Sequence, residues 1–328
     1  MFALTSRIKI GDIVLNQVHD IKIEKSWRKL DDKALIKFPR ANKLLAKRFK
    51  VGDPVTIELA YDGEFKQVEF EGYVKKIMPN IPLMIECEDP IWLLRQGSVN
   101  LEWKNTTVRS IVSKIIGIAN EANADRASTP ITLIGKEGEE DVQLSTFRIT
   151  NASAAEAINK VKQEFGLAAY FKGHQLYVGL AYGNPGARVG YHVAKNVIKN
   201  NLTFRKKEDI KIKVKAISIL EDNERLVKEL GDDNGDQRTL YFQNITDEKR
   251  LTEMARAKLD ELKYDGFEGD ISTFLIPYAE PGMTGVITDP DQPEQKDGAY
   301  VIDSVTTTFG VKGARRKVEL GALVGDTE

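Results

Sequence analysis

Residues that could carry out catalysis are few and scattered along this sequence. The three histidines, His19, His174 and His192, lack the HExxH spacing of a zinc enzyme, and the single Cys87 cannot build a thiolate zinc site. Acidic residues on both sides of Cys87 would raise the pKa of its thiol, so we expect a packed, unreactive cysteine. The sequence therefore predicts no catalytic metal centre and no cofactor.

An acidic run at Asp232–Asp236 suggests a calcium-binding loop at first sight. An EF-hand needs Gly at its sixth position and Glu at its twelfth, and these places hold Gln237 and Gln243. The pair Asn234-Gly235 instead predicts a hairpin with a type I′ turn. Glycine motifs for phosphate binding and the Gly-x-Ser-x-Gly motif are also missing, so the sequence indicates neither a phosphate site nor a serine nucleophile.

Two groups of residues leave other functions open. Among 49 acidic side chains, two carboxylates could meet in space as in a cell-wall hydrolase, although nothing in the sequence selects a pair. Trp92 and Trp103 could stack on sugars or bases, and the alternating Lys211, Lys213 and Lys215 could follow a nucleic-acid strand. Apolar neighbours of the tryptophans favour core packing, and acidic neighbours of the lysines favour a solvated strand face. We therefore favour a non-enzyme, with a glycan- or nucleic-acid-binding module and a hydrolase as alternatives.

Composition indicates an ordinary globular chain. Its 328 residues are 41% hydrophobic and 30% charged, which suits roughly two or three domains. The 48 basic and 49 acidic side chains nearly cancel, so nucleic acid is not expected as a specific ligand. No apolar stretch approaches the roughly 18 residues that cross a bilayer, and the first residues do not form a signal peptide. We expect no membrane-spanning segment and folding in a cytoplasm.

Residues 1–100 consist mainly of short segments with alternating apolar and polar residues, separated by turn residues, which predicts a small barrel or sandwich. The stretch 25–50 breaks this pattern, because ten Lys or Arg residues are interspersed with apolar side chains and Pro39 interrupts any helix. We interpret 25–50 as an extended basic arm that contacts another subunit or a tube.

Residues 101–182 predict a small α+β domain. A helix from Val108 to about Asn123 follows a cap at Asn105-Thr106-Thr107, and a second helix spans Ser153 to Phe165. A hairpin with its turn at Lys172-Gly173 comes next.

Residues 183–328 open with a Gly-Pro linker and return to strands. They include one convincing helix at 246–262, for which Thr246 is the expected cap.

A weak internal repeat links the two ends of the chain. Gly52–Ile57 followed by Gly72–Ile77 is similar to Gly282–Ile287 followed by Tyr300–Val305, with Tyr73 aligned to Tyr300. Each unit is a strand, a polar turn and a Tyr-Val strand. Duplication and chance similarity between two antiparallel meanders both explain this pattern.

Several short phrases together resemble the opening of phage tail hub proteins, namely the late-control D family, the Mu-like baseplate hub and the first part of type VI spike proteins. The phrases are Lys25–Leu30, Phe38–Arg40, Val51–Val55, Phe70–Val74 and Cys87–Trp92. The order of the later helices, hairpin and strands is also similar to that family.

The resemblance implies a mainly β, α+β fold with two small tail-tube-like barrels, at 1–100 and 183–328, on either side of the α+β domain. It further implies a homotrimeric baseplate hub between a hexameric tail tube and a trimeric spike, with wedge proteins as further partners. We expect such a protein in the tail baseplate of a virion or injection particle, assembled in the bacterial cytoplasm. The sequence reaches Glu328 without a β-helix or lysozyme segment, so a spike or hydrolase is expected on another chain.

Overall fold

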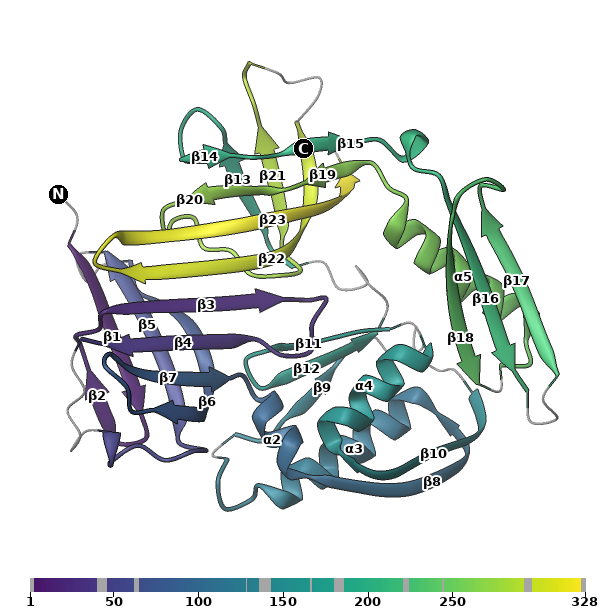
Figure 1. The fold of residues 1–328 in the computed structure, drawn as a ribbon, viewed down its shortest axis with the longest axis horizontal. Coiled ribbons are helices and arrows are strands. Elements are labelled where there is room, and N and C mark those ends of the chain that lie inside the picture. Colours follow the sequence, from purple (N-terminus) through teal and green to yellow (C-terminus); the bar gives the residue numbers. More distant parts are fainter. Residues whose placement is uncertain are drawn as a thin grey trace.

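The computed structural model describes residues 3–39, 46–61, 65–127, 129–135, 143–165, 167–179, 186–220, 224–243, 245–291 and 297–325. Strands predominate and a few helices accompany them, which confirms a mainly β, α+β protein. One large curved sheet occupies the left and top of Figure 1, helices gather at the lower centre, and a smaller sheet with its own helix stands at the right. No helix in the described ranges is long and apolar enough to cross a membrane.

The N-terminal strands form one end of the large sheet. They are β1 (Leu4–Ile10), β2 (Ile13–Leu15), β3 (Asp20–Ser26), β4 (Lys33–Phe38), β5 (Pro54–Tyr61), β6 (Gln67–Met78) and β7 (Leu83–Glu88). Their antiparallel order is β3-β4-β7-β6-β5-β1-β2. Because side chains alternate between faces of a strand, Ile8, Ile36, Ile57 and Ile85 all point into one buried core. We call these seven strands repeat 1.

The stretch 25–50 is not an extended arm where the structure describes it. Its residues 33–38 form β4, which lies between β3 and β7 with Ala34, Ile36 and Phe38 buried. The prediction was wrong because basic residues that alternate with apolar ones are also typical of a strand with one buried face. Residues 40–45 of the expected arm lie outside the described residues.

The central part of the chain forms the predicted α+β unit. Its elements are α2 (Ile91–Gln96), β8 (Ser98–Thr107), α3 (Val108–Ala122), β9 (Thr132–Ile134), β10 (Gln143–Ser153), α4 (Ala154–Phe165), β11 (Ala168–Lys172) and β12 (Gln175–Gly179). The Thr107 hydroxyl caps α3 by accepting from the Ser110 N–H. Ser153 and Glu156 cap α4 reciprocally, each side chain accepting from the other residue's N–H. Both predicted helices are confirmed, and so is the hairpin over its described residues, 168–179.

The C-terminal part returns to the large sheet. Its strands are β13 (Arg188–His192), β14 (Lys199–Asn200), β15 (Thr203–Arg205), β19 (Gly266–Glu268), β20 (Asp270–Thr273), β21 (Thr284–Thr288), β22 (Gly298–Gly310) and β23 (Gly313–Gly325). We call these strands repeat 2. Between β15 and β19 the chain builds a separate unit, which we call the insert: η1 (Lys207–Asp209), β16 (Ile212–Ile219), β17 (Arg225–Gly231), β18 (Asp236–Gln243) and α5 (Glu248–Leu262).

The hairpin expected at Asn234-Gly235 is absent. β17 and β18 lie on opposite sides of β16, antiparallel and parallel to it, and the turn between them crosses the start of β16. The Asp232 N–H donates to the Ile212 carbonyl at 2.9 Å. A Cβ at Gly235 would lie 2.6 Å from the Ile212 backbone, so close passage, not a type I′ turn, explains the glycine.

α5 is confirmed as a helix of the insert, but its cap differs from the expectation. Asp247, not Thr246, accepts from the Lys249 N–H. Leu251 and Ala255 of α5 share one buried cluster with Val214 and Ala216 of β16. The helix therefore covers the small sheet of the insert.

Repeats 1 and 2 share one strand connectivity. In repeat 1, β3 pairs with β4, β4 with β7, β7 with β6 and β6 with β5. In repeat 2, β14 and β15 pair with β20 and β19, β20 with β23, β23 with β22 and β22 with β21. The insert therefore stands where repeat 1 has only the β3–β4 turn. One pairing differs, since β1 runs antiparallel to β5 whereas β13 runs parallel to β21.

Detailed geometry supports duplication over chance similarity. The Gly52 N–H donates to the Val74 carbonyl at 2.8 Å, and the Gly282 N–H donates to the Ile302 carbonyl at 2.9 Å. Both glycines have a positive φ, of 91° and 82°. Directly after Val74 and after Ile302, the ladders to β7 and β23 shift by a bulge. Val74 thus corresponds to Ile302, which shifts the sequence alignment by one residue.

The two repeats join into one sheet. β3 pairs with β22 antiparallel over seven residue pairs, from Ser26 opposite Ser304 to Asp20 opposite Gly310. Among the residues that the structure describes, the strand pairings do not close into a ring, so the two barrels are not confirmed. The domain limits at 100 and 182 stay a prediction.

Candidate functional site at the junction of the repeats

The residues considered for chemistry lie apart from one another. Cys87 is fully buried in β7, and burial, followed by the charge of Glu86, raises the pKa of its thiol, which confirms a packed cysteine. His19 precedes β3, His174 lies in the β11–β12 turn and His192 ends β13. Within the described ranges, no three His, Cys, Asp or Glu side chains are grouped to hold a metal ion.

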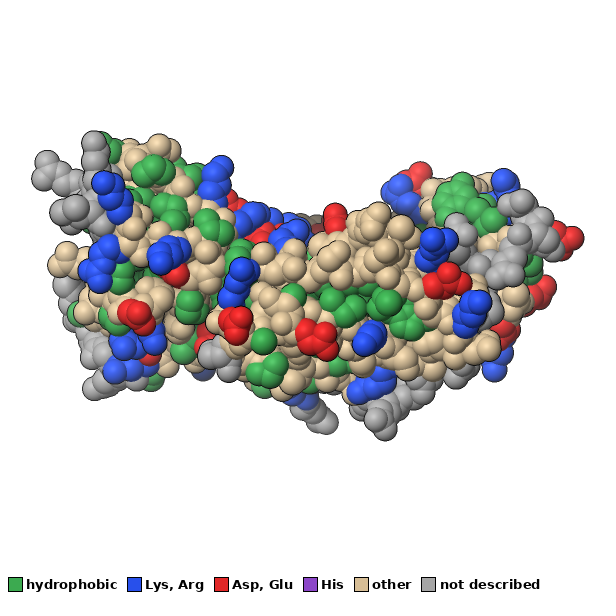
Figure 2. All heavy atoms as spheres, turned by 90° about the horizontal axis from the view of Figure 1, so that it is seen from below, with side chains coloured by type: hydrophobic (Ala, Val, Ile, Leu, Met, Phe, Trp, Pro, Cys, Tyr) green, Lys and Arg blue, Asp and Glu red, His purple; other side chains and the backbone are tan. Residues whose placement is uncertain are grey.

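The candidate binding residues are engaged inside the protein. Trp92 is 7% exposed and stacks on Tyr73 with ring centroids 5.4 Å apart. Trp103 packs beside Phe147, and their ring centroids are 6.0 Å apart. The ammonium groups of Lys213 and Lys215 lie 2.8 and 2.9 Å from the Glu229 carboxylate. The packing interpretation of Trp92 is confirmed, and two of the three lysines of the strand face share an ion pair with the neighbouring Glu229. Figure 2 likewise shows both charge signs interspersed over one face of the molecule.

Buried polar residues instead gather where repeat 1 meets repeat 2. The β3–β4 turn reaches β22, where the Trp27 indole N–H donates to Asp303 at 2.8 Å and the Arg28 guanidinium donates to it at 2.6 and 3.0 Å. Burial raises the pKa of Asp303, and Arg28 opposes this effect. Asp303 sits at the bulge of β22, which turns its carboxylate toward the turn.

A buried ion pair forms a second contact between the repeats. Arg316 of β23 and Glu69 of β6 lie 2.5 Å apart, with side chains 0% and 3% exposed. Arg316 also donates to the carbonyls of Leu275 and Pro277, and Glu69 accepts from the Thr307 hydroxyl at 3.4 Å. Four strands separate β6 from β23 in the sheet order, so the sheet curls until these side chains meet.

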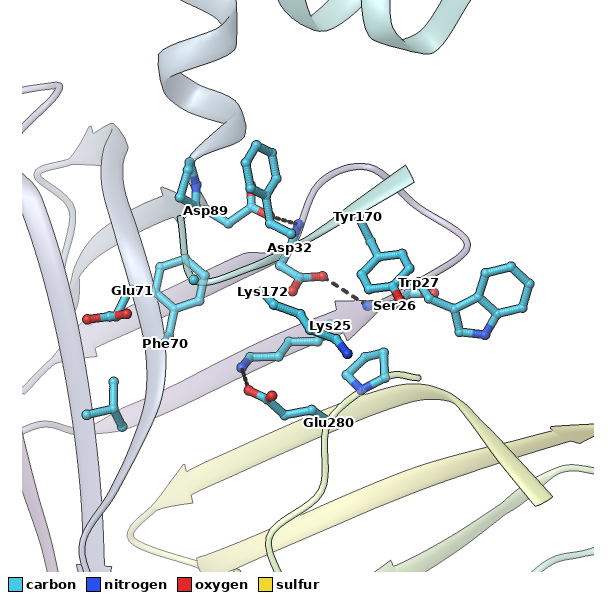
Figure 3. Close-up of a pocket in the computed structure, with 15 residues that line it drawn as sticks. Lys25, Ser26, Trp27, Asp32, Phe70, Glu71, Asp89, Tyr170, Lys172 and Glu280 are labelled. Carbon is cyan, nitrogen blue, oxygen red and sulfur yellow. Dashed lines mark hydrogen bonds and ion pairs between the residues drawn. The ribbon is translucent and has the colours of Figure 1, made fainter. Parts of the chain in front are cut away.

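A small cavity lies at the third contact, where repeat 1, β11 and the segment before β21 come together (Figure 3). Lys25 and Glu280 form an ion pair at 3.0 Å on one side. Burial would raise the pKa of Glu280, but Lys25 and the donated Tyr278 hydroxyl outweigh it and lower that pKa. The cavity encloses about 80 Å³, far less than the roughly 300 to 1,000 Å³ of usual ligand pockets.

Two carboxyl groups, Asp32 and Asp89, line this cavity. Asp89 accepts from the N–H groups of Asp32 at 3.2 Å and Ile91 at 3.0 Å, and Asp32 accepts from the Ser26 N–H at 2.9 Å. Burial raises the pKa of Asp32 to about 7 and the pKa of Asp89 well above its ordinary value, and each is also affected by nearby acidic charge. These carboxyls fix two turns, and the cavity is too small to place a sugar between them.

Sequence reasoning missed the junction residues Asp32, Asp89, Glu69, Asp303 and Arg316. Each is a charged residue in or beside a strand, where the alternation alone predicts a solvent-facing side chain for most positions. Arg316 gives the clearest missed signal, because it lies on the same face of β23 as Ala314 and Val318, which are buried.

No family model matches the sequence, and no curated protein is significantly similar to it. Solved structures are similar over the whole chain. A tail protein from Neisseria meningitidis MC58 superposes with a TM-score of 0.68 at 13% identity, over 97% of this chain and 96% of that one. The 43 kDa tail protein of prophage MuSo2 from Shewanella oneidensis gives 0.65 at 14%, over 97% of both chains. This chain has the phage tail protein fold.

The phage tail fold extends to a secretion machine. A component of the Escherichia coli type VI secretion system, itself structurally similar to the T4 bacteriophage tail proteins gp27 and gp5, gives a TM-score of 0.62 at 12% identity. That match covers 98% of this chain and 77% of the other. The resemblance to tail hub proteins seen in the sequence phrases is thus confirmed at the level of the fold.

Proposed function

We propose that this protein is a structural baseplate hub of a phage tail or phage-derived injection machine, joining a hexameric tail tube to a trimeric spike. The observation that supports it best is the duplicated sheet within a phage tail fold. One chain carries two joined repeats, so a homotrimer would present six repeats to a tube and three copies to a spike. Its place would be the tail baseplate, reached after assembly in the bacterial cytoplasm with tube, spike and wedge proteins.

The junction chemistry supports a structural role over catalysis. The buried charges are used in ion pairs and turn contacts between parts of the chain, as with Glu69–Arg316 and Arg28–Asp303. A hub transmits position from one part to another, and buried ion pairs and hydrogen bonds between those parts help to fix their relative positions. The alternatives of a glycan- or nucleic-acid-binding module and of a cell-wall hydrolase gain no specific support from these contacts.

The test is reconstitution with candidate tube and spike proteins from the same genome. Mass photometry should find three chains together, and electron microscopy should show tube and spike proteins on opposite faces of that particle. A tube protein from an unrelated phage serves as the control and should not bind. A strict monomer at micromolar concentration, unchanged by either partner, would contradict the hub, and a cleared band in a peptidoglycan zymogram would establish the hydrolase instead.

A further inference from the structure

The β3–β4 turn, residues 27–32, contacts three parts of the molecule that lie far from it in the sequence. The Arg28 guanidinium donates to Asp303 of β22 at 2.6 and 3.0 Å and to Glu261 of α5 at 3.2 Å. The Lys162 ammonium of α4 donates to the Arg28 carbonyl at 2.6 Å. This one turn therefore holds repeat 2, the insert and the α+β unit together.

The same turn forms part of the wall of a groove between these units. Trp27 and Arg28 line the groove, which has a volume of about 1040 Å³, together with residues of α4, β18, α5 and the end of β23. A movement of the turn would therefore change both the groove and the contacts that hold its walls in place.

At its other end the turn is fixed by two carboxyl groups that share the small cavity of Figure 3. The Asp32 carboxyl accepts from the Ser26 N–H, and the Asp89 carboxyl accepts from the Asp32 N–H at 3.2 Å. The Asp89 N–H donates in return to the Asp32 carbonyl at 3.1 Å. Asp32 and Asp89 thus set the position of the last residues of the turn.

This cavity is lined by more acidic than basic groups. Its charged side chains are those of Asp32, Asp89, Glu71, Glu280, Lys25 and Lys172. Glu280 forms an ion pair with Lys25, the Lys172 ammonium lies over the Tyr170 ring, and Glu71 is exposed. Asp31, next to the cavity, pairs with Lys33 at 2.8 Å. Negative charges on both Asp32 and Asp89 would therefore be poorly compensated, which favours a proton on the pair.

We propose that the β3–β4 turn is a proton-operated latch. With a proton on the Asp32–Asp89 pair, the turn stays closed against β22, α4 and α5. When that proton passes to solvent, the two negative charges are relieved by water that enters the cavity as the turn moves outward. The movement releases Arg28 from Asp303 and Glu261. The latch goes beyond the proposed hub function and does not depend on it.

The direction of the pH response follows from the closed state. Burial raises the pKa of Asp32 to about 7 and the pKa of Asp89 well above its ordinary value. Once the turn has opened, water surrounds these carboxyls and their pKa values return toward about 4. The open state therefore holds fewer protons, so opening becomes easier as the pH rises to about 7 and levels off above it.

Other titratable groups beside the cavity are three aromatic side chains. Burial raises the pKa of Tyr170 to about 12 and also raises the pKa of Tyr278, so both stay neutral near pH 7. Burial lowers the pKa of His174, which lies in the β11–β12 turn. His174 is thus the neighbour whose titration the test must separate from that of the carboxyl pair.

Hydrogen exchange of the full chain, followed by mass spectrometry and corrected for intrinsic rates, tests the latch between about pH 5 and pH 7.5. The reporters are the amides of Ser26, Trp27 and Asp32, which donate to the Asp32 carboxyl, the Asp303 carbonyl and the Asp89 carboxyl. We expect their exchange to become about tenfold faster or more at the higher pH, while amides of α3 keep their protection. Asp32→Asn should remove this difference.

Labelling of the Lys162 amine reports the contact of the latch with α4. At pH 7.5, labelling relative to the exposed Lys114 should be greater in the wild type than in Asp32→Asn, because the open turn no longer covers the Lys162 ammonium. Asp89→Asn is a second, independent variant and should also reduce the pH response.

His174→Gln is the matched control, because it removes the other group that changes charge and keeps a polar partner for Tyr73. It should respond to pH as the wild type does. Loss of the response in His174→Gln, or an unchanged response in both aspartate variants, would overturn the latch. So would an equal acceleration of exchange in α3, which would show that the whole fold loosens and not the turn.

Discussion

Asp32 is a buried junction residue whose ionisation should affect stability. Its pKa rises from about 3.8 to about 7 on folding because it is buried, with Lys25 opposing the rise. A raised pKa in the fold means that the folded protein holds a proton that the unfolded chain releases above pH 4. The contribution of Asp32 to the free energy of unfolding is therefore present at low pH and is lost as the pH rises toward 7.

We expect Asp32→Asn to flatten this dependence. The amide keeps an acceptor for the Ser26 N–H but carries no charge, so the free energy of unfolding of the variant should fall less steeply than that of the wild type as the pH rises from 4 to 7. Urea unfolding at three pH values in that window measures it. Asp125→Asn, at an exposed turn, should follow the wild-type curve. Parallel curves for Asp32→Asn and wild type would show that this carboxyl does not titrate as the geometry indicates.

Single residues were predictable where packing alone decides their place. Trp92 lies among apolar neighbours in the sequence and Cys87 lies in a strand-like stretch, and both are buried. Asp32 and Asp89 were not found, because their environment is made by segments far apart in the chain, including Glu280. No spacing rule within the sequence brings such residues together.

At the scale of elements, the Glu69–Arg316 pair fixes β6 against β23. Removing one member of a buried pair leaves the other charge without compensation, which costs about 3 to 5 kcal/mol. We expect Glu69→Gln and Arg316→Met each to lower the free energy of unfolding by this amount. The double variant should lose less than the sum, because no buried charge is left.

Denaturant unfolding of the two single variants and the double variant measures the coupling. Lys317→Met, on the same strand but in an exposed pair with Asp270, is the control and should cost less than about 1 kcal/mol. Strict additivity of Glu69→Gln and Arg316→Met would show that the pair does not couple the two strands.

Elements held by local rules were predicted correctly, and those held by distant partners were not. α3 and α4 have caps and apolar faces within their own sequence, so their limits follow from it. The Asn234-Gly235 turn was misinterpreted because β16, which intervenes between β17 and β18, precedes both in the chain. β4 was missed because its lysines obscured the alternation of period two.

At the scale of the whole molecule, residues up to 179 and residues from 186 onward are held together by direct contacts as well as by the segment that links them. They share the β3–β22 ladder, the Glu69–Arg316 pair and the Trp27 and Arg28 contacts to Asp303. We expect a chain cut at a protease site placed within 180–185 to remain one particle. Size-exclusion chromatography should show both fragments in one peak under native conditions.

Urea is the control for that experiment, since it should release the fragments. Arg316→Met in the cut chain should release them at a lower urea concentration. Separation of the fragments in buffer alone would mean that the two ends of the chain are independent domains, as the predicted limit at 182 implies when taken strictly.

The seven residue pairs between β3 and β22 also determine how the molecule responds to a pull. Ladder hydrogen bonds lie perpendicular to their strands, so a force along the strands shears all of them at once. A force across the strands unzips them one after another and meets far less resistance. Tension that reaches the protein along β3 and β22 is therefore borne collectively, and the direction of pull decides whether this joint acts as a rigid link or as a release.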